Sequence, residues 1–238
     1  MAVMKLQTLQ RHWNRFAKQD AKWAILTCPG TEGNRWDPDA FMATGREDVD
    51  ALMRALAERG IDVSRRRALD FGCGVGRLSV ALANYFDAVD GTDISETMIA
   101  QAIQHPKVRY HVNNQSLAQF PTGAYDLVYS FITLQHIPRP YSLEYIKEFV
   151  RLLSPHGVAA FQVPSAVNNR RERWRQRLPF LAAAIGYARR GIWANMQRHA
   201  LTREEVAAVV AAAGGKIVAE QGGFGNAELP SSFYYVTR

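Results

Sequence analysis

From residue 66 onward, short apolar runs rich in β-forming residues alternate with stretches of helical periodicity. This alternation predicts β–α–β units, in which a parallel sheet is buried between layers of helices, and it argues against a β-sandwich or a helix bundle. We expect strands over residues 66–71, 88–93, 108–112, 125–131 and 157–163. The helices between them are expected over residues 75–86, 95–104 and 140–153.

The C-terminal part of the chain predicts one further helix and two strands. Thr202 and Glu205 have the spacing of a capping box, and Gly214 should end the helix that this box opens. Strands over residues 216–221 and 232–237 are separated by a loop too short for a crossover helix, so they should pair antiparallel. The predicted fold is α/β, with a seven-stranded, mostly parallel sheet, helices on both faces and an antiparallel last strand.

Residues 1–60 are expected to form an N-terminal helical cap. They are rich in aromatic residues, which should pack on the rest of the fold rather than remain in water. Thr44 and Glu47 have capping-box spacing and predict a helix that leads into the first strand. Residues 61–238 are then the main α/β domain, with a helical insertion at about residues 165–200.

The positive charge of the chain is concentrated in this insertion. The formal net charge is +7, and residues 165–198 contain eight arginines but a single acidic residue, Glu172. The rest of the chain is therefore neutral, which argues against a general nucleic-acid-binding fold.

An apolar stripe at helical spacing runs through the insertion, and Pro179 should break or restart the helix that carries it. Three interpretations remain open: a lid over a pocket, an amphipathic element on a membrane surface, and a solvated face. If the segment is a lid, its arginines would favour an anionic substrate. The stripe consists of Trp174, Leu178, Leu181 and Ile185.

The first predicted strand ends in an acidic residue and enters a glycine-rich turn before a helix. Glycines accept positive φ and lack Cβ, so a ligand can lie directly against the backbone, in front of a helix N-terminus. The dinucleotide fingerprint G-x-G-x-x-G would need glycine at position 77, where this chain has Arg77. The observed spacing, D-x-G-x-G-x-G, argues against a nucleotide-dependent oxidoreductase.

This spacing resembles the first motif of class I S-adenosylmethionine-dependent methyltransferases, and the segments that follow resemble the family as well. Asp93 ends the second strand, where the family holds the ribose hydroxyls, and residues 125–131 and 152–157 resemble its fourth-strand motif and the turn before strand five. The chain departs from the family at Asn114, where an aspartate is common, and at His156, which replaces a glycine. The resemblance covers residues 66–164 and implies a Rossmann-like methyltransferase domain that uses S-adenosyl-L-methionine.

The resemblance also implies a set of cofactor-binding residues around the strand ends. Arg46, from the cap, could reach the methionine carboxylate. The other predicted cofactor contacts are Asp70, Gly72, Cys73, Gly74, Gly76, Arg77, Asp93, Ile94, Met98, Asn114, Gln115, Ser116, Ser130 and Phe131.

His136, just past the fourth strand, is the predicted catalytic residue. It would be a general base if the acceptor must lose a proton, and otherwise it would shape the acceptor pocket. Residues 130–133 lack the motifs that the superfamily uses for amide, adenine or cytosine methylation, so O- or N-methylation of a small molecule is expected. The alternative is an RNA methyltransferase or binding module that uses the arginine-rich insertion.

Further expectations concern the cell and the assembly. The N-terminus lacks the apolar region of a signal peptide, and the longest apolar stretch is too short to span a bilayer. The two cysteines, Cys28 and Cys73, form neither a disulfide framework nor a zinc-site spacing, so no metal is expected. We therefore expect a cytoplasmic protein, and the sequence predicts no oligomeric state.

Overall fold

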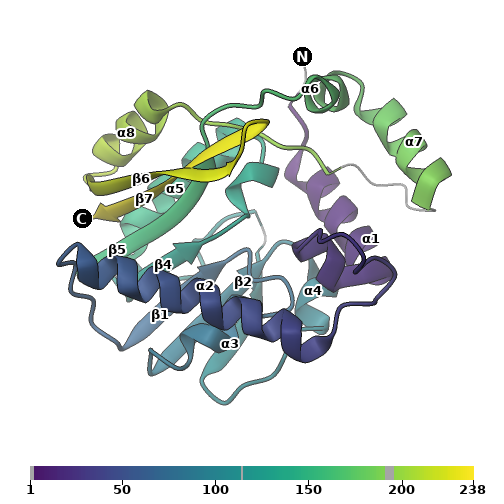
Figure 1. Cartoon of the computed structure of the whole chain (residues 1–238). Coiled ribbons are helices and arrows are strands. Elements are labelled where there is room, and N and C mark those ends of the chain that lie inside the picture. The colour runs from purple at the N-terminus through teal and green to yellow at the C-terminus, as the bar shows by residue number, and fades with distance from the viewer. Residues whose placement is uncertain (1–2, 114, 191–195) are drawn as a thin grey trace.

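The computed structural model describes residues 3–113, 115–190 and 196–238. In these residues seven strands form one sheet in the order β3-β2-β1-β4-β5-β7-β6 (Figure 1). Strands β1 to β5 run parallel, and β7 lies antiparallel between β5 and β6, which confirms the predicted fold. The strands are β1 (Arg67–Phe71), β2 (Ala88–Asp93), β3 (Val108–Val112), β4 (Tyr125–Ser130), β5 (Leu153–Pro164), β6 (Lys216–Asn226) and β7 (Leu229–Thr237).

Helices cover both faces of the sheet (Figure 1). Helices α2 and α3 pack on one face, and α5 and α8 pack on the other. The helices are α1 (Leu6–Ile25), α2 (Pro38–Glu58), α3 (Arg77–Leu82), α4 (Glu96–Ala100), α5 (Arg139–Leu152), α6 (Arg170–Arg177), α7 (Pro179–Arg190), α8 (Arg203–Ala212) and the 3-10 turn η1 (Leu134–His136). No helix in the described ranges combines the length and the apolar character needed to cross a membrane.

Successive strand residues divide between two cores, as the two-residue period of a strand requires. Ala68 of β1 belongs to the core under α2 and α3, whereas Leu69 and Phe71 belong to the core under α5 and α8. Strand β4 is buried along its whole length, because it is central and has helices over both faces.

A buried carboxylate joins four neighbouring strands by hydrogen bonds. Asp90 of β2 is 3% exposed and accepts hydrogen bonds from Arg67 of β1 at 2.8 Å and from Tyr125 of β4 at 3.0 Å. His111 of β3 donates to its other oxygen at 2.7 Å. Three donors from three strands thus converge on one carboxylate, and they satisfy a charge that would be costly to bury alone.

Several local predictions differ from the structure. Helices α3 and α4 are shorter than the predicted 75–86 and 95–104, and strands β6 and β7 are longer than the predicted 216–221 and 232–237. Helix α2 begins at its N-cap Asp37, whose carboxylate accepts from the Ala40 N–H at 2.8 Å, and not at Thr44. The Thr44 hydroxyl donates to the Phe41 carbonyl instead, within a helix that already exists. Strand β5 begins at Leu153, before the predicted residue 157, because Leu153 pairs with Tyr125 ahead of a register shift.

Other local predictions are confirmed. The Ser95 hydroxyl accepts from the Met98 N–H at the start of α4. The helical conformation is interrupted between α6 and α7, immediately before Pro179. At α8 the capping box is complete, since the Thr202 hydroxyl accepts from the Glu205 N–H and the Glu205 carboxylate accepts from the Thr202 N–H.

The capping box generates a first prediction. Thr202→Ala removes an acceptor for the first turn of α8, so it should lower the free energy of unfolding by about 0.5–2 kcal/mol in urea denaturation. Thr202→Ser keeps the hydroxyl and should stay close to wild type. Equal losses for both variants would show that the threonine methyl group, and not the cap, stabilises this helix.

Candidate functional site

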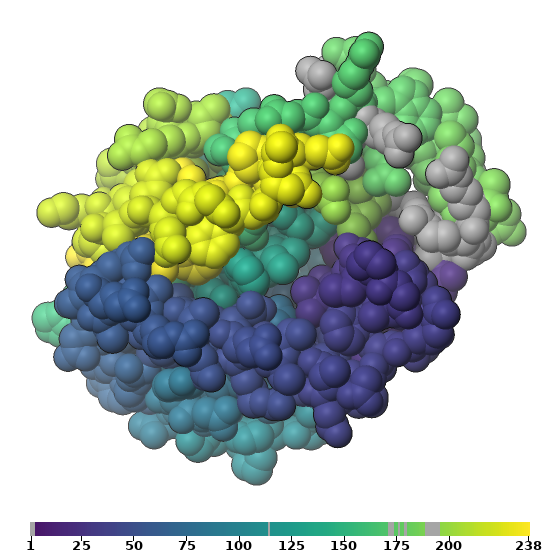
Figure 2. All heavy atoms as spheres, in the orientation of Figure 1, coloured from purple at the N-terminus to yellow at the C-terminus, as the bar shows by residue number. Residues whose placement is uncertain are grey.

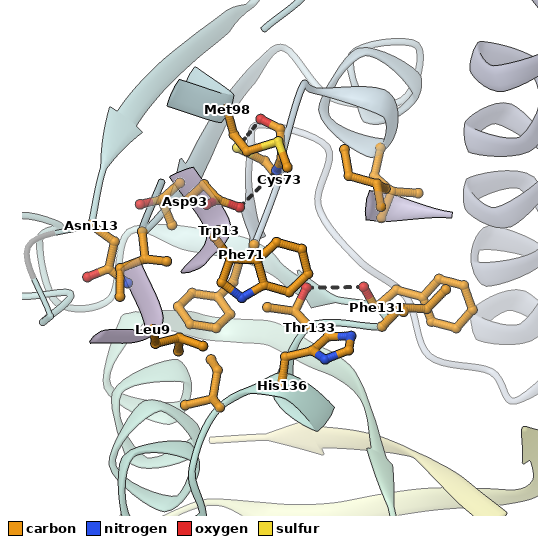
Figure 3. A pocket seen from close by; sticks show the side chains of 18 of the residues that line it. Leu9, Trp13, Phe71, Cys73, Asp93, Met98, Asn113, Phe131, Thr133 and His136 are labelled. Atoms are coloured by element: carbon orange, nitrogen blue, oxygen red, sulfur yellow. Dashed lines mark hydrogen bonds between the residues drawn. The ribbon is translucent and has the colours of Figure 1, made fainter. Parts of the chain in front are cut away.

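A cavity lies at the carboxyl ends of β1, β2 and β4 (Figure 3). Its floor is the glycine-rich turn after β1, and its remaining walls come from η1 and from helix α1. Leu6, Leu9, Trp13 and Ile25 of α1 all line it, whereas α2, which the structure describes in full, contributes no residue to the wall. The first helix of the predicted cap therefore covers the cavity, and the second belongs to the core beside α3.

Helix α1 is not continuous. Asp20 has non-helical φ and ψ of −162° and 86°, which kinks the helix before its last turn. Its carboxylate accepts from the Trp23 N–H at 3.1 Å and from the Asn34 N–H at 2.8 Å. The kink brings Ile25, at the end of α1, to the wall of the cavity.

The glycine-rich turn lines the cavity and is also in close contact with side chains of Thr133 and Ile25. Gly72 has φ of +80°, and a Cβ added there would lie 2.1 Å from the Thr133 side chain. Gly74 has φ of +53°, and a Cβ there would lie 2.6 Å from Cδ1 of Ile25. Both positions need glycine for their backbone conformation and for the close approach of a neighbour.

Asp93, at the end of β2, joins this turn to the start of α4. Its Oδ2 accepts from the Gly74 N–H at 3.0 Å and its Oδ1 from the Ser95 N–H at 2.7 Å. Burial raises the pKa of Asp93 to about 6, against the opposing effect of these two N–H groups. Each carboxylate oxygen retains a further lone pair for a ligand hydroxyl.

Asn113 lies beyond Asp93 at the end of β3, on the same side of the cavity (Figure 3). It is 3% exposed, and its amide nitrogen donates to the Tyr145 hydroxyl at 3.2 Å. Its Oδ1 is buried and has no hydrogen-bond partner in the described part of the chain. The sequence-based prediction chose Asn114, which lies outside the described residues.

The cavity brings together many of the predicted cofactor residues but not all. Asp70 and Ser130 are buried behind the wall, and the Asp70 carboxylate accepts from the Ser79 hydroxyl at 2.6 Å. Gln115 and Ser116 are exposed and border a neighbouring groove. Gly76 caps α3 and is absent from the cavity wall. The predicted residues that do line the cavity are Gly72, Cys73, Gly74, Arg77, Asp93, Ile94, Met98, Phe131 and His136.

The predicted contact from Arg46 is not supported, because Arg46 is exposed and does not line the cavity. Gly45 faces α3 so closely that an added Cβ would lie 2.4 Å from the Arg77 carbonyl oxygen, and the next residue of α2 turns by about 100° into solvent. Arg77 does line the cavity. It is 3% exposed, pairs with Asp48 at 2.5 Å, and its buried Nε has no partner among the described residues.

His136 lies on the opposite side of the cavity from Asp93 and Asn113 (Figure 3). Its Nδ1 is 3.0 Å from the Gln197 carbonyl, which can only accept, so Nδ1 carries the proton. Its Nε2 then accepts from the Gln135 amide at 3.0 Å. Burial, with a smaller effect of the Arg198 charge, lowers the pKa of His136 to about 4. The ring is therefore neutral at pH 7.

The chain that returns from the insertion is held against this wall. The Gln135 carbonyl accepts from the His199 N–H at 2.7 Å. Next to it, His136 donates to the Gln197 carbonyl. Two adjacent bonds thus join η1 to the returning chain. Met196 packs in the same cluster as Phe16 of α1. The end of the insertion is thereby fixed to both walls of the cavity.

Helices α6 and α7 contribute no described residue to the cavity wall. They project beyond α1 at the upper right of the molecule (Figure 2). Three members of the predicted apolar stripe face solvent, with Leu178, Leu181 and Ile185 being 47%, 48% and 38% exposed, whereas Trp174 is half-buried. Helix α7 instead buries its small residues Ala182 and Ala183, so a lid that closes the cavity with this stripe is not what the structure shows.

Comparison with known proteins shows which family the chain resembles. Residues 68–157, less than half of the chain, match a protein family described as a methyltransferase domain. The matched segment spans the glycine-rich turn, Asp93, Asn113 and His136, all of which line the cavity.

Two curated relatives show the sequence similarity. The chain is 31% identical over 139 residues to a ubiquinone biosynthesis O-methyltransferase of Methylococcus capsulatus, an alignment that covers 56% of this chain and 57% of the relative. It is 34% identical over 156 residues to a trans-aconitate 2-methyltransferase of Variovorax paradoxus, covering 64% of this chain and 58% of the relative. The chain thus matches little more than half the length of each relative.

A solved structure shows the fold similarity over the whole chain. The magnesium protoporphyrin IX methyltransferase of Synechocystis with bound SAH superposes with a TM-score of 0.64 at 18% identity, covering 98% of this chain and 99% of the other. The similarity of fold therefore extends beyond residues 68–157.

The contact of the glycine turn with α1 generates a second prediction. Gly74→Ala should destabilise the protein, because its Cβ meets Ile25 and because alanine disfavours positive φ. Ile25→Val removes the Cδ1 atom and should recover part of the loss in the double variant. A double-mutant cycle in urea should give a coupling of at least about 0.5 kcal/mol. Additive effects would mean that α1 moves aside without cost.

Proposed function

We propose that this chain is an S-adenosyl-L-methionine-dependent methyltransferase that methylates a small molecule. The observation that carries the proposal is the convergence of three features on one cavity. The glycine turn exposes backbone, Asp93 offers carboxylate lone pairs, and Asn113 offers a buried oxygen without a partner among the described residues. Together they match the shape and polarity of a nucleoside ligand.

The residues present fit the cofactor at both of its polar ends. Asp93 would accept from the ribose hydroxyls, and Oδ1 of Asn113 would accept from the adenine amino group. Nε of Arg77, a buried donor without a partner in the described ranges, would donate to the methionine carboxylate. An orphaned acceptor and an orphaned donor are costly in a buried wall, and one ligand would satisfy both.

The bound cofactor supplies a methyl group that is already activated by its positive sulfur. The protein has to place a nucleophile in line with that methyl group and to exclude water. Leu9, Trp13 and Ile137 form apolar walls suited to both tasks. The activities for which the relatives are named, in ubiquinone biosynthesis and on trans-aconitate, support a small-molecule acceptor, and no described feature favours nucleic acid.

For the insertion we propose contact with an anionic membrane surface. Large apolar side chains are exposed along α7, among them Phe180 at 74% and Tyr187 at 57%. Eight arginines between residues 165 and 198 provide the complementary charge. A basic amphipathic helix of this kind lies in the headgroup region of anionic bilayers. The same positive charge would favour an anionic acceptor.

Calorimetry with S-adenosylhomocysteine tests the cofactor assignment. Asp93→Ala should weaken binding by roughly 1–3 kcal/mol through the loss of hydrogen bonds to the ribose. Asp87→Ala, an exposed carboxylate just before the other end of β2, is the matched control and should bind like wild type. Unchanged affinity of the Asp93 variant would refute the ribose contact, and an absence of binding to the wild-type protein would refute the proposed function.

Vesicle sedimentation tests the membrane contact. The protein should sediment with vesicles that contain phosphatidylglycerol but not with pure phosphatidylcholine, and salt should weaken the binding. Exchanging Leu181 and Ile185 together for serine should release it. Val218→Ser, which alters an exposed apolar residue of β6, is the control. Equal behaviour on both vesicle types would leave α7 as a solvated surface.

A further inference from the structure

Few side chains in the described wall of the cavity can take a proton from the acceptor molecule. A hydroxyl that is methylated must lose its proton, and an amine that is protonated at neutral pH must lose one before it can attack. A carboxylate needs no base, because it is already ionised at neutral pH. The proton-accepting groups in the described cavity wall therefore limit the class of acceptor.

Four described wall residues are of types that serve as general bases, namely Cys73, Asp93, His136 and Tyr145. Both Asp93 oxygens are engaged by backbone N–H groups of Gly74 and Ser95, and the carboxylate lies across the cavity from His136. In the proposed function its remaining lone pairs hold the ribose. This carboxylate is thus committed to the cofactor side.

Both ring nitrogens of His136 are engaged by described neighbours. Its Nδ1–H donates to the Gln197 carbonyl, and its Nε2 accepts from the Gln135 amide. With burial lowering its pKa to about 4, the ring would bind an acceptor proton poorly at pH 7 even if Gln135 moved away. The geometry makes His136 a positioning residue that holds η1 to the returning chain.

The remaining polar groups of the described wall keep their own protons. Burial raises the pKa of Tyr145 to about 12, and burial with the charges of Asp70 and Asp93 raises the pKa of the Cys73 thiol well above its usual value. The Thr133 hydroxyl donates to the Phe131 carbonyl at 3.2 Å. The phenol, the thiol and the hydroxyl are all protonated at neutral pH.

A positively charged residue adjoins the contact of His136 with the returning chain. Arg198 follows Gln197, whose carbonyl accepts from the His136 ring. Arg198 belongs to the segment of residues 165–198, which carries the whole net charge of the chain. A surface of this sign raises the local concentration of anions. The apolar side chains of Leu9, Trp13 and Ile137 suit the body of such a molecule.

We propose that the acceptor is a carboxylic acid with an apolar body, bound as its carboxylate, and that the product is a methyl ester. This inference rests on the proposed function. One carboxylate oxygen forms the new C–O bond as the C–S bond of the cofactor breaks, and the bonding pair returns to sulfur. The negative charge of the acceptor and the positive charge of the sulfonium cancel, so no proton has to be moved.

Matched acceptors test the inference on the full chain with S-adenosyl-L-methionine. Cinnamic acid is paired with cinnamyl alcohol, and benzoic acid with phenol, so that each pair shares its body and differs in the nucleophile. The acids should give products heavier by one methylene that mild alkali hydrolyses. The alcohol and the phenol should react at least about 100-fold more slowly, because no described residue of the wall removes their proton.

The pH profile and two variants of His136 add independent readouts. Between pH 7 and 9 Asp93 stays ionised, His136 stays neutral and the acid stays ionised, so kcat/KM should be nearly flat. His136→Ala should raise KM, and His136→Asn should recover most of that rise, because asparagine can still donate to the Gln197 carbonyl. A general base would instead lose kcat by about 10²–10⁴-fold in both variants.

The outcomes separate the inference from the function on which it rests. If S-adenosylhomocysteine binds but none of the acids is methylated, the carboxylate inference is wrong and the cofactor assignment stands. Faster methylation of phenol or cinnamyl alcohol, with a rate that rises with pH, also overturns the inference. If S-adenosylhomocysteine does not bind, the proposed function fails and the inference fails with it.

Discussion

The buried Asp90 carboxylate is the interaction on which the arrangement of the central strands depends. Its donors Arg67, His111 and Tyr125 come from β1, β3 and β4, while Asp90 itself belongs to β2. These bonds join the four strands in the register that the sheet has. In that register the carboxyl ends of β1, β2 and β4 meet at the cavity.

The glycine turn is equally a packing element and a binding surface. Gly72 presses on Thr133 of the acceptor side, and Gly74 presses on Ile25 of α1. A side chain at position 72 would force Thr133 aside, whereas one at position 74 would meet the end of the Ile25 side chain. The glycines of this turn therefore serve the packing of the protein itself as well as the exposure of backbone to a ligand.

Features encoded within a few residues were predictable from the sequence, and features set by the direction of a side chain were not. The strands, the Ser95 cap and the capping box at Thr202 follow from local patterns. Arg46, predicted to reach the methionine carboxylate, lies on the exposed side of α2, because neighbouring residues of a helix point about 100° apart. Asn113, which lines the cavity, precedes the predicted Asn114, which lies outside the described residues. The exposed stripe of α7 depends equally on tertiary packing.

The roof of the cavity is a kinked helix near the N-terminus, and this links ligand affinity to local stability. Leu9 and Trp13 line the cavity from the part of α1 that precedes the kink at Asp20. A molecule that packs against them adds contacts that hold α1 on the body of the protein. By thermodynamic linkage, a ligand that contacts α1 only in its docked position stabilises that position. Substitutions that favour undocking of α1 should therefore weaken binding.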